Sequence, residues 1–154
     1  MNRWYALAAL VLLLDRVSKF WITENFALGD QTAVWSMFSI VRWHNEGAAF
    51  SFLNDAGGWQ REVFIVLAVG FCLFIVREIY LLKKHEHFTG FIYAMVLGGA
   101  LGNLWGRVME GYVVDFILVH YQEYYFPAFN LADSALFLGA CGWILLIFRS
   151  EKSE

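Results

Sequence analysis

Two aspartates, Asp115 and Asp133, combine the residue type and the setting that acid–base chemistry needs. Asp115 has apolar neighbours on both sides, and Asp133 stands at the start of a long apolar stretch. Two carboxyl groups that lie close together share one proton, because ionising both is costly. The ionised member can accept a proton from water while the protonated member donates one to a carbonyl oxygen or a leaving amine. Such a pair can hydrolyse a peptide bond without a metal ion.

Other polar residues are spaced so that they could join this pair. Asp15 and Lys19 are four positions apart, as are Asn103 and Arg107, so each pair shares one face of a helix. The simpler interpretation of Asp15 and Lys19 is an ion pair that holds a helix end among the lipid headgroups. For Asn103 and Arg107, a buried polar site is at least as well supported.

Two further segments have simple conformational explanations. Residues 45–52 combine Asn45 with a run of glycine and alanine, which favours a turn or a close backbone approach. Asn130 and Asp133 precede an apolar stretch, where either side chain suits a helix N-cap. Two acids from different elements, both in apolar surroundings, are harder to explain as caps.

Glycines at positions 98, 102 and 106 follow one another at intervals of four residues. This seam of small residues favours close packing between helices in lipid. Gly106 also suits the left-handed position that ends a helix.

Other catalytic chemistries find less support. The histidines lack the His-Glu-x-x-His spacing of zinc peptidases, and no glycine-rich phosphate loop is present. The two cysteines fall within apolar stretches, where a buried structural thiol is the simpler interpretation. We therefore expect neither a metal nor a cofactor. The residues concerned are His44, His85, His87 and His120, and Cys72 and Cys141.

The composition defines the class of protein that must position these residues. Of 154 residues, 60% are apolar and 16% are charged, whereas soluble domains have about 25% charged residues. A single proline and scattered charge exclude a disordered chain, and two cysteines exclude a disulfide scaffold. A net charge of −3 without a basic stripe argues against nucleic acid as a partner. The chain is therefore predicted to be a small integral membrane protein.

Four apolar stretches are long enough to cross a membrane, which needs about 20 residues each. We predict an all-α membrane protein with one integral domain, residues 1–154. No small-x-small cleavage site follows the first stretch, so we expect it to remain as an anchor. Lysines and arginines in the tails and the second connection place both termini in the cytoplasm. The predicted helices are about 4–22, 63–82, 88–105 and 129–148, with outer segments 23–62 and 106–128.

Both outer segments are long and rich in aromatic residues, which is typical of functional loops. Residues 38–43 are β-prone. Because the third predicted helix runs outward and the fourth returns, Asp115 and Asp133 both belong to the outer end of the bundle. The sequence therefore places the chemistry at the outer face of the membrane.

Five stretches together resemble the lipoprotein signal peptidase (signal peptidase II) family, whose members are bacterial inner-membrane aspartyl peptidases. Any one stretch is a weak signal, but the five occur in the family's order and spacing across nearly the whole chain. The resemblance implies four membrane helices, a small periplasmic β-cradle and a short periplasmic helix over the site. The matching stretches are 15–19, 45–50, 98–107, 113–116 and 129–134.

The same resemblance implies that Asp115 and Asp133 form a catalytic dyad. The implied substrate is a prolipoprotein whose cysteine already carries diacylglycerol, and cleavage falls just before that cysteine. Membrane lipid and cyclic-peptide inhibitors of the globomycin type are further implied partners, and a monomer is expected. Residues that match positions lining or supporting the site are Asp15, Lys19, Asn45, Gly47, Gly99, Asn103, Arg107 and Asn130.

Two positions depart from the family's usual pattern. The family usually has glutamine where this chain has Arg16, and it usually has aspartate where this chain has Gly106. Losing that carboxylate could leave Arg107 without a partner, which is costly for a buried cation. The sequence therefore predicts that the Gly106→Asp variant is more stable or more active than this chain.

Two other classes of function stay open at this point. A small four-helix, proton-coupled transporter is expected to bury an acid near the middle of a helix, whereas these acids cluster at one rim. A non-catalytic homologue would keep the two aspartates as relics, and Gly106 keeps that alternative open.

Overall fold

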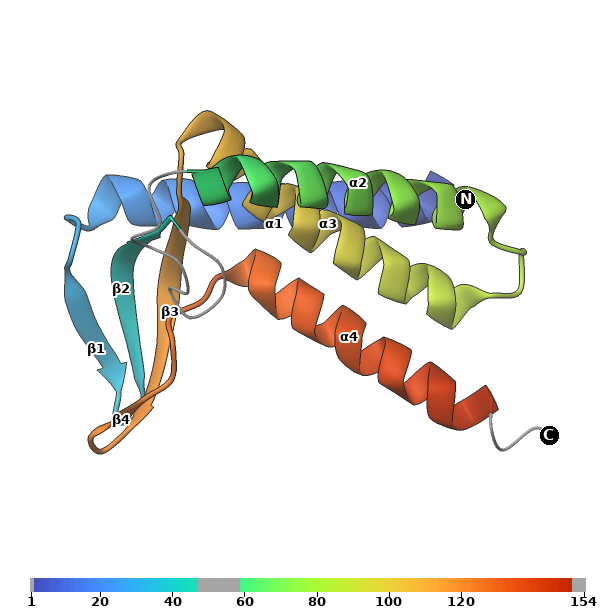
Figure 1. The fold of residues 1–154 in the computed structure, drawn as a ribbon. Coiled ribbons are helices and arrows are strands. Elements are labelled where there is room, and N and C mark those ends of the chain that lie inside the picture. The colour runs from blue at the N-terminus through green and yellow to red at the C-terminus, as the bar shows by residue number, and fades with distance from the viewer. Residues whose placement is uncertain (1, 47–58, 151–154) are drawn as a thin grey trace.

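The computed structural model describes residues 2–46 and 59–150. Four long helices form a bundle, and four antiparallel strands form a sheet at one end of it (Figure 1). The start of α1 and the last turn of α4 both lie at the end of the bundle that is far from the sheet. In chain order, the elements are α1 (Asn2–Asn25), β1 (Gln31–Trp35), β2 (Phe38–Asn45), α2 (Trp59–Leu81), α3 (His87–Met109), β3 (Val113–Tyr121), β4 (Tyr124–Tyr125) and α4 (Leu131–Ser150).

The four helices coincide with the four predicted apolar stretches to within a few residues. Within the described ranges, three of them are long and apolar enough to cross a membrane, namely residues 61–81, 87–109 and 131–148. The remaining helix, α1, carries four charged residues in its second half, namely Asp15, Arg16, Lys19 and Glu24. The chain therefore has the make-up of a helical membrane protein with a small sheet.

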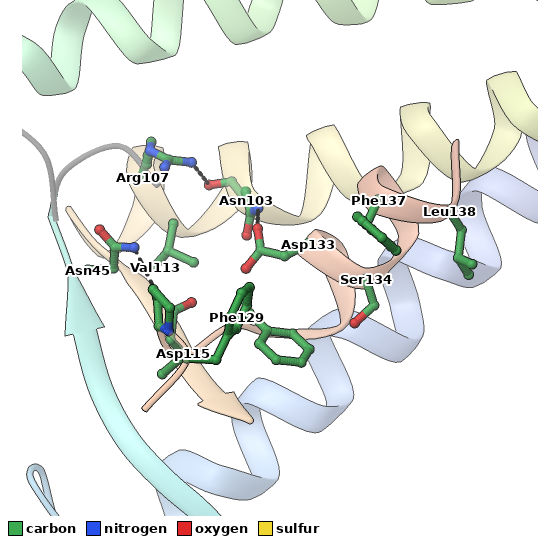
Figure 2. Close-up of a pocket in the computed structure, with 13 residues that line it drawn as sticks. Asn45, Asn103, Arg107, Val113, Asp115, Phe129, Asp133, Ser134, Phe137 and Leu138 are labelled. Carbon is green, nitrogen blue, oxygen red and sulfur yellow. Dashed lines mark hydrogen bonds between the residues drawn. The ribbon is translucent and has the colours of Figure 1, made fainter. Parts of the chain in front are cut away.

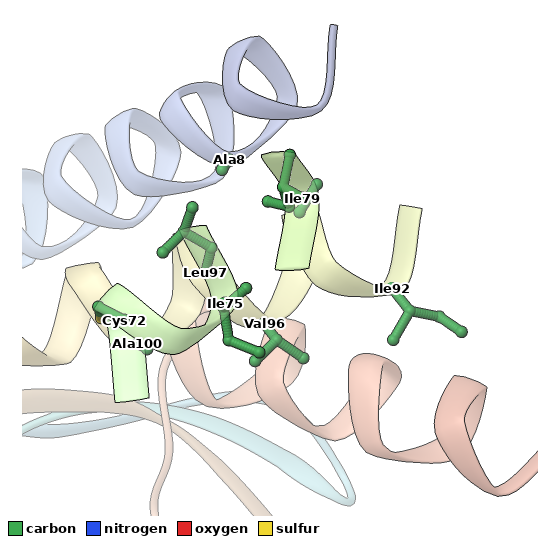
Figure 3. Close-up of a cluster of buried hydrophobic side chains, with 9 residues drawn as sticks. Ala8, Cys72, Ile75, Ile79, Ile92, Val96, Leu97 and Ala100 are labelled. Atoms are coloured by element: carbon green, nitrogen blue, oxygen red, sulfur yellow. The ribbon is translucent and has the colours of Figure 1, made fainter. Parts of the chain in front are cut away.

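Helix α3 lies at the centre of the bundle and packs against α1, α2 and α4. Their shared core is apolar and includes Ala8 of α1, Ile75 of α2 and Leu97 of α3 (Figure 3). Cys72 lies in this core as the buried thiol that the sequence predicts, whereas Cys141 is only half-buried. The contacts between the helices in this core are therefore apolar, and the polar side chains of the candidate site lie at one end of the bundle.

The glycine seam on α3 lets α1 approach closely, as predicted. A Cβ atom added at Gly98 would lie 2.6 Å from Cβ of Val11, and one added at Gly102 would lie 2.6 Å from Oδ2 of Asp15. Both contacts are far shorter than van der Waals distance, so only glycine fits without a shift of α1. The seam thus brings the Asp15 carboxylate against α3.

The sheet has the order β1–β2–β3–β4, and its strand β2 confirms the β-prone segment. The register of β2 on β3 shifts between Ile40 and Trp43, so that Asn45 pairs with Val113. Without this bulge, His44 would pair with Val113 instead of Asn45. Since alternate residues of a strand share one face, the bulge puts Asn45 on the same face as Asp115.

The short outer helix implied by the resemblance is absent from residues 26–46 and 110–130, the described parts of the two outer segments. Residues 47–58 lie outside the described ranges. One arginine joins the sheet to the end of α1, where backbone carbonyls lack helical partners. Arg42 of β2 donates to the carbonyl oxygens of Thr23 (3.0 Å) and Phe26 (2.7 Å).

The end of α3 differs from the sequence prediction. The helix continues past Gly106 to Met109, and the residue with positive φ is Gly111, at 88°. Gly106 is needed for a different reason, because a Cβ atom there would lie 2.7 Å from the carbonyl oxygen of Tyr112. That oxygen belongs to the backbone, so it cannot move aside by rotating a side chain.

We expect the Gly106→Ala variant to be less stable by about 1–3 kcal/mol, the usual cost of overpacking. Thermal unfolding in detergent measures this loss. The matched control is Gly70→Ala in α2, where nothing lies within 4 Å of the added Cβ atom. There the better helix propensity of alanine should raise stability by up to about 1 kcal/mol. Equal melting temperatures for the two variants would contradict the crowding at Gly106.

Candidate functional site

A cavity of about 620 Å³ opens at the end of the bundle that carries the sheet. It lies between α3, α4 and the adjoining ends of β2 and β3 (Figure 2). Asp115 from β3 and Asp133 from α4 both line it, so the two aspartates singled out in the sequence share one cavity. The other lining residues are Asn45, Asn103, Arg107, Val113, Phe126, Pro127, Ala128, Phe129, Ser134, Phe137 and Leu138.

Asp115 is 4% exposed, and asparagines hold both of its carboxyl oxygens. Nδ2 of Asn45 donates to Oδ2 at 3.0 Å, and Nδ2 of Asn130 donates to Oδ1 at 2.7 Å. Asn45 reaches this position because of the bulge in β2. Burial raises the pKa of the Asp115 carboxyl from its ordinary value of 3.8 to about 6, although both amide hydrogen bonds oppose the shift.

This raised pKa predicts a pH-dependent stability. Between about pH 4 and pH 6, folded Asp115 holds a proton that the unfolded chain has lost. Its contribution to stability is therefore full below pH 4 and is lost as the pH rises through 6, with a magnitude on the order of 3 kcal/mol. Unfolding of the chain and of Asp115→Asn, measured from pH 4 to pH 7, checks this. Parallel stability curves for the two proteins would contradict it.

Asp133 is the third residue of α4 and takes part in a capping box with Asn130. The Asn130 backbone N–H donates to Oδ2 of Asp133 at 3.1 Å, and the Asp133 backbone N–H donates to Oδ1 of Asn130 at 3.0 Å. Asn130 is thus the N-cap, as the sequence allowed, and its amide also reaches Asp115. One fully buried side chain therefore links both aspartates to the start of α4.

Substitutions of Asn130 can separate its two roles. Serine is a good N-cap but cannot reach Asp115 as the amide does, whereas alanine does neither. We expect Asn130→Ala to be about 1 kcal/mol less stable than Asn130→Ser. Both variants also lose the bond to Asp115, so any activity that depends on that bond should fall to the same extent in both. Unfolding and initial rates measure the two effects. Wild-type activity in Asn130→Ser would show that only the cap matters.

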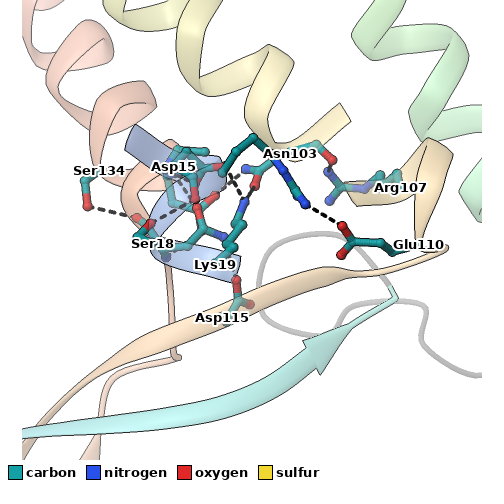
Figure 4. Close-up of polar contacts among 12 residues, drawn as sticks. Asp15, Ser18, Lys19, Asn103, Arg107, Glu110, Asp115 and Ser134 are labelled. Atoms are coloured by element: carbon teal, nitrogen blue, oxygen red, sulfur yellow. Dashed lines mark hydrogen bonds and ion pairs between the residues drawn. The ribbon is translucent and has the colours of Figure 1, made fainter. Parts of the chain in front are cut away.

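Asp15 and Lys19 form the ion pair that their spacing suggested, with Nζ of Lys19 2.8 Å from Oδ2 of Asp15. Their side chains are 0% and 2% exposed, so the pair does not lie among lipid headgroups, and that interpretation is wrong. Oδ1 of Asp15 accepts a hydrogen bond from the backbone N–H of Ala132 at 2.9 Å. The pair therefore fastens α1 to the first turn of α4 (Figure 4).

Asn103 and Arg107 share the end of α3 that lies next to the sheet. Nδ2 of Asn103 donates to Oδ1 of Asp133 at 2.7 Å, which places Asn103 between the cavity and the buried pair. The Arg107 guanidinium lies 5.8 Å from the ring centre of Phe64, and its Nη1 donates to the Asn103 carbonyl at 3.4 Å. Gly99 faces α4, where a Cβ atom would lie 2.5 Å from the Ala132 carbonyl oxygen. Gly47 lies outside the described residues.

These contacts remove the basis for the sequence-based prediction about Gly106. Arg107 has partners without a neighbouring carboxylate, because it contacts both Phe64 and the Asn103 carbonyl. The side chain of an aspartate at position 106 would also meet the Tyr112 carbonyl oxygen, as alanine would. The structure therefore opposes a gain in stability for Gly106→Asp.

The apolar half of the cavity was not identified from the sequence. Phe126, Pro127 and Phe129 line it before α4, and Phe137 and Leu138 line it along α4. Phe137 is 69% exposed, so this half is continuous with the apolar outer surface of α4. The available signal was the apolar run at 126–129, directly before Asn130. Among the described residues, no three His, Cys, Asp or Glu side chains gather as a metal site would require.

Fold and cavity together define a helical membrane protein in which two aspartates line one cavity at one end of the bundle. A family model for signal peptidase (SPase) II matches residues 7–149, and the chain therefore belongs to the signal peptidase II family of proteases. The resemblance carried by the five sequence stretches is thereby confirmed.

Relatives of similar length support this membership. A lipoprotein signal peptidase of Cellvibrio japonicus is 46% identical, covering 94% of this chain and 85% of its own length. One of Pseudomonas aeruginosa is 47% identical over 97% of this chain and 90% of its own length. A solved bacterial membrane enzyme shares the fold with a TM-score of 0.87 and 28% identity, covering 100% of this chain and 92% of that one.

Proposed function

We propose that this protein is a membrane aspartyl endopeptidase that removes the signal peptide from diacylglyceryl-modified prolipoproteins, just before the lipidated cysteine. The observation that carries the proposal is the meeting of Asp115 and Asp133 in one cavity of a chain that belongs to the signal peptidase II family. The apolar half of the same cavity suits a lipid-bearing substrate, because it opens along the exposed face of α4.

The environments of the two carboxyl groups suggest their roles. Burial raises the pKa of Asp115 to about 6, which favours Asp115 as the member that holds the shared proton. Asp133 accepts hydrogen bonds on both oxygens, from the Asn103 amide and the Asn130 backbone, which hold its carboxyl group in place beside the cavity. Asp133 is then the general base, and Asp115 is the general acid.

In the first step, Asp133 takes a proton from water as the water oxygen attacks the scissile carbonyl carbon. Asp115 gives its proton to the carbonyl oxygen, which yields a neutral tetrahedral intermediate. In the second step, Asp133 returns its proton to the departing amine, and Asp115 recovers a proton from the gem-diol as the carbonyl reforms. Each carboxyl group ends the cycle as it began.

The same proposal includes the placement of the protein. All four helices, α1 included, are proposed to span a bacterial inner membrane as one unit, residues 1–154. Helix α1 packs along α3, and its Asp15–Lys19 pair is buried against α3 and α4 rather than facing lipid. With both termini cytoplasmic, the cavity lies at the periplasmic face, where it meets signal peptides of exported proteins.

A gel-shift cleavage assay in detergent tests the function. The expected result is cleavage of a diacylglyceryl-modified prolipoprotein with an N-terminal lipid-modified cysteine in the product, identified by mass spectrometry. The matched substrate without diacylglycerol should be cleaved far more slowly, and a cyclic peptide of the globomycin type should inhibit. Folded protein that leaves the modified substrate intact would instead identify a non-catalytic homologue.

A further inference from the structure

Lys19 is a buried cation whose donors point at the centre of the site. Its side chain is 2% exposed, and its Nζ donates to Oδ2 of Asp15 at 2.8 Å and to Oδ1 of Asn103 at 3.0 Å. An ammonium group has no acceptor, so the side-chain oxygen of Asn103 must face Lys19. The NH₂ group of Asn103 must then point away from Lys19, and it donates to Oδ1 of Asp133 at 2.7 Å.

We propose that Lys19 is a positioning residue for the peptidase reaction: by holding the Asn103 carbonyl oxygen, it presents the Asn103 amide to Asp133 and fixes the carboxylate that activates water. The inference rests on the proposed function, because it assigns Asp133 the role of base. Lys19 is separated from Asp133 by the Asn103 side chain, so it acts through Asn103 and does not touch the reacting atoms.

The need for Lys19 follows from the near symmetry of an amide. The oxygen and nitrogen of Asn103 are similar in size, so a half-turn of the amide costs little sterically. In the turned state, the carbonyl oxygen would face the Asp133 carboxylate, and two acceptors would repel each other. The Lys19 ammonium forbids that state, because the NH₂ group cannot accept its hydrogen bond.

The neighbouring charged groups do not offer a substitute for this contact. Asp15 holds Lys19 in place from one turn earlier on α1 and is itself fixed by the N–H of Ala132. Arg107, from α3, donates to the backbone carbonyl of Asn103. Asp115, from β3, is held by Asn45 and Asn130. Within the described part of the chain, the donor to the Asn103 side-chain oxygen is Lys19.

A double-mutant cycle tests whether Lys19 acts through Asn103. We expect Lys19→Met to lower kcat at least about tenfold with KM nearly unchanged, since misplacing a catalytic group by 1 Å can cost on the order of 100-fold. In the Asn103→Leu background, Lys19→Met should lower kcat no further. The matched control is Arg16→Met, which removes a cation of the same helix that pairs with Glu110 at 2.6 Å and should leave kcat unchanged. Multiplicative losses in the cycle would overturn the proposal.

A spectroscopic readout separates this inference from the proposed function. In ¹⁵N NMR spectra of the intact protein, the Asn103 NH₂ protons should be resolved and protected from exchange, and Lys19→Met should abolish that protection. If Lys19→Met does not fold, Asp15→Asn/Lys19→Met, which buries no unpaired charge, is compared with Asp15→Asn. Protection that survives the loss of Lys19 overturns the inference, whatever the activity. A wild-type chain that does not cleave, yet loses protection in the variant, overturns only the proposed function.

Discussion

Asp133→Asn is expected to lower the cleavage rate at least about 1,000-fold, because the variant lacks the carboxylate that is proposed to accept a proton from water. The asparagine also replaces one accepting oxygen by an NH₂ donor, which then faces another donor, either the Asn103 NH₂ group or the Asn130 backbone N–H. Melting temperature therefore has to be measured beside activity, and a loss of about 1 kcal/mol is expected from the damaged capping box.

Asp115→Asn should also inactivate the protein, but less completely. An asparagine NH₂ group can still donate a hydrogen bond to the scissile carbonyl oxygen, although it cannot transfer a proton. We therefore expect the residual rate of Asp115→Asn to exceed that of Asp133→Asn, in single-turnover cleavage at saturating protein.

The matched control is Asp30→Asn, the same replacement at an exposed acid of the outer segment whose Oδ2 accepts a hydrogen bond from the Ala27 N–H. Asparagine can keep that bond, so full activity is expected. Wild-type rates in either dyad variant would contradict the assignment of the site. The reverse order of residual rates would exchange the roles of the two acids and leave the dyad itself intact.

Asp15→Ala is expected to have the largest effect on stability, a loss of about 3–5 kcal/mol. The variant leaves the Lys19 ammonium buried without its carboxylate, and it leaves the Ala132 N–H without an acceptor at the start of α4. Both groups are buried away from water in the folded protein, so water cannot replace the hydrogen bonds that they lose. Equilibrium unfolding in mixed micelles measures the change.

Glu110→Gln is the control for this prediction, because it breaks the other ion pair near the end of α1. Arg16 and Glu110 are 2.6 Å apart, but their side chains are 24% and 28% exposed. An ion pair that water still reaches contributes no more than about 1 kcal/mol. If Asp15→Ala lowers the free energy of unfolding as little as Glu110→Gln does, the buried Asp15–Lys19 pair does not hold α1 to α4 as described.

These two predictions concern the same few residues, since the first turn of α4 is held from both sides. Asp15 accepts from the N–H of Ala132, and Asn130 accepts from the N–H of Asp133. The position of the proposed base is therefore set by the bonds that stabilise the start of its helix. Loss of stability and loss of activity should accompany each other at this turn, except where a substitution such as Asn130→Ser keeps the cap.

The sequence by itself was sufficient for what local spacing and composition control. Runs of about 20 apolar residues define helices in a membrane whatever their neighbours are. A spacing of four residues puts Asp15 beside Lys19 and Asn103 beside Arg107 on any helix. The capping potential of Asn130 and the close approach allowed by the glycine seam likewise depend on a few adjacent positions.

Tertiary structure alone decided how these pieces meet. A one-residue bulge in β2 puts Asn45 on the face of Asp115, 70 residues away in sequence. Packing of α1 against α3 and α4 turned an expected headgroup ion pair into a buried one that caps another helix. The crowding at Gly106 depends on where the chain returns after α3. Such contacts depend on register and on the relative positions of whole elements, and these follow from packing that no local pattern specifies.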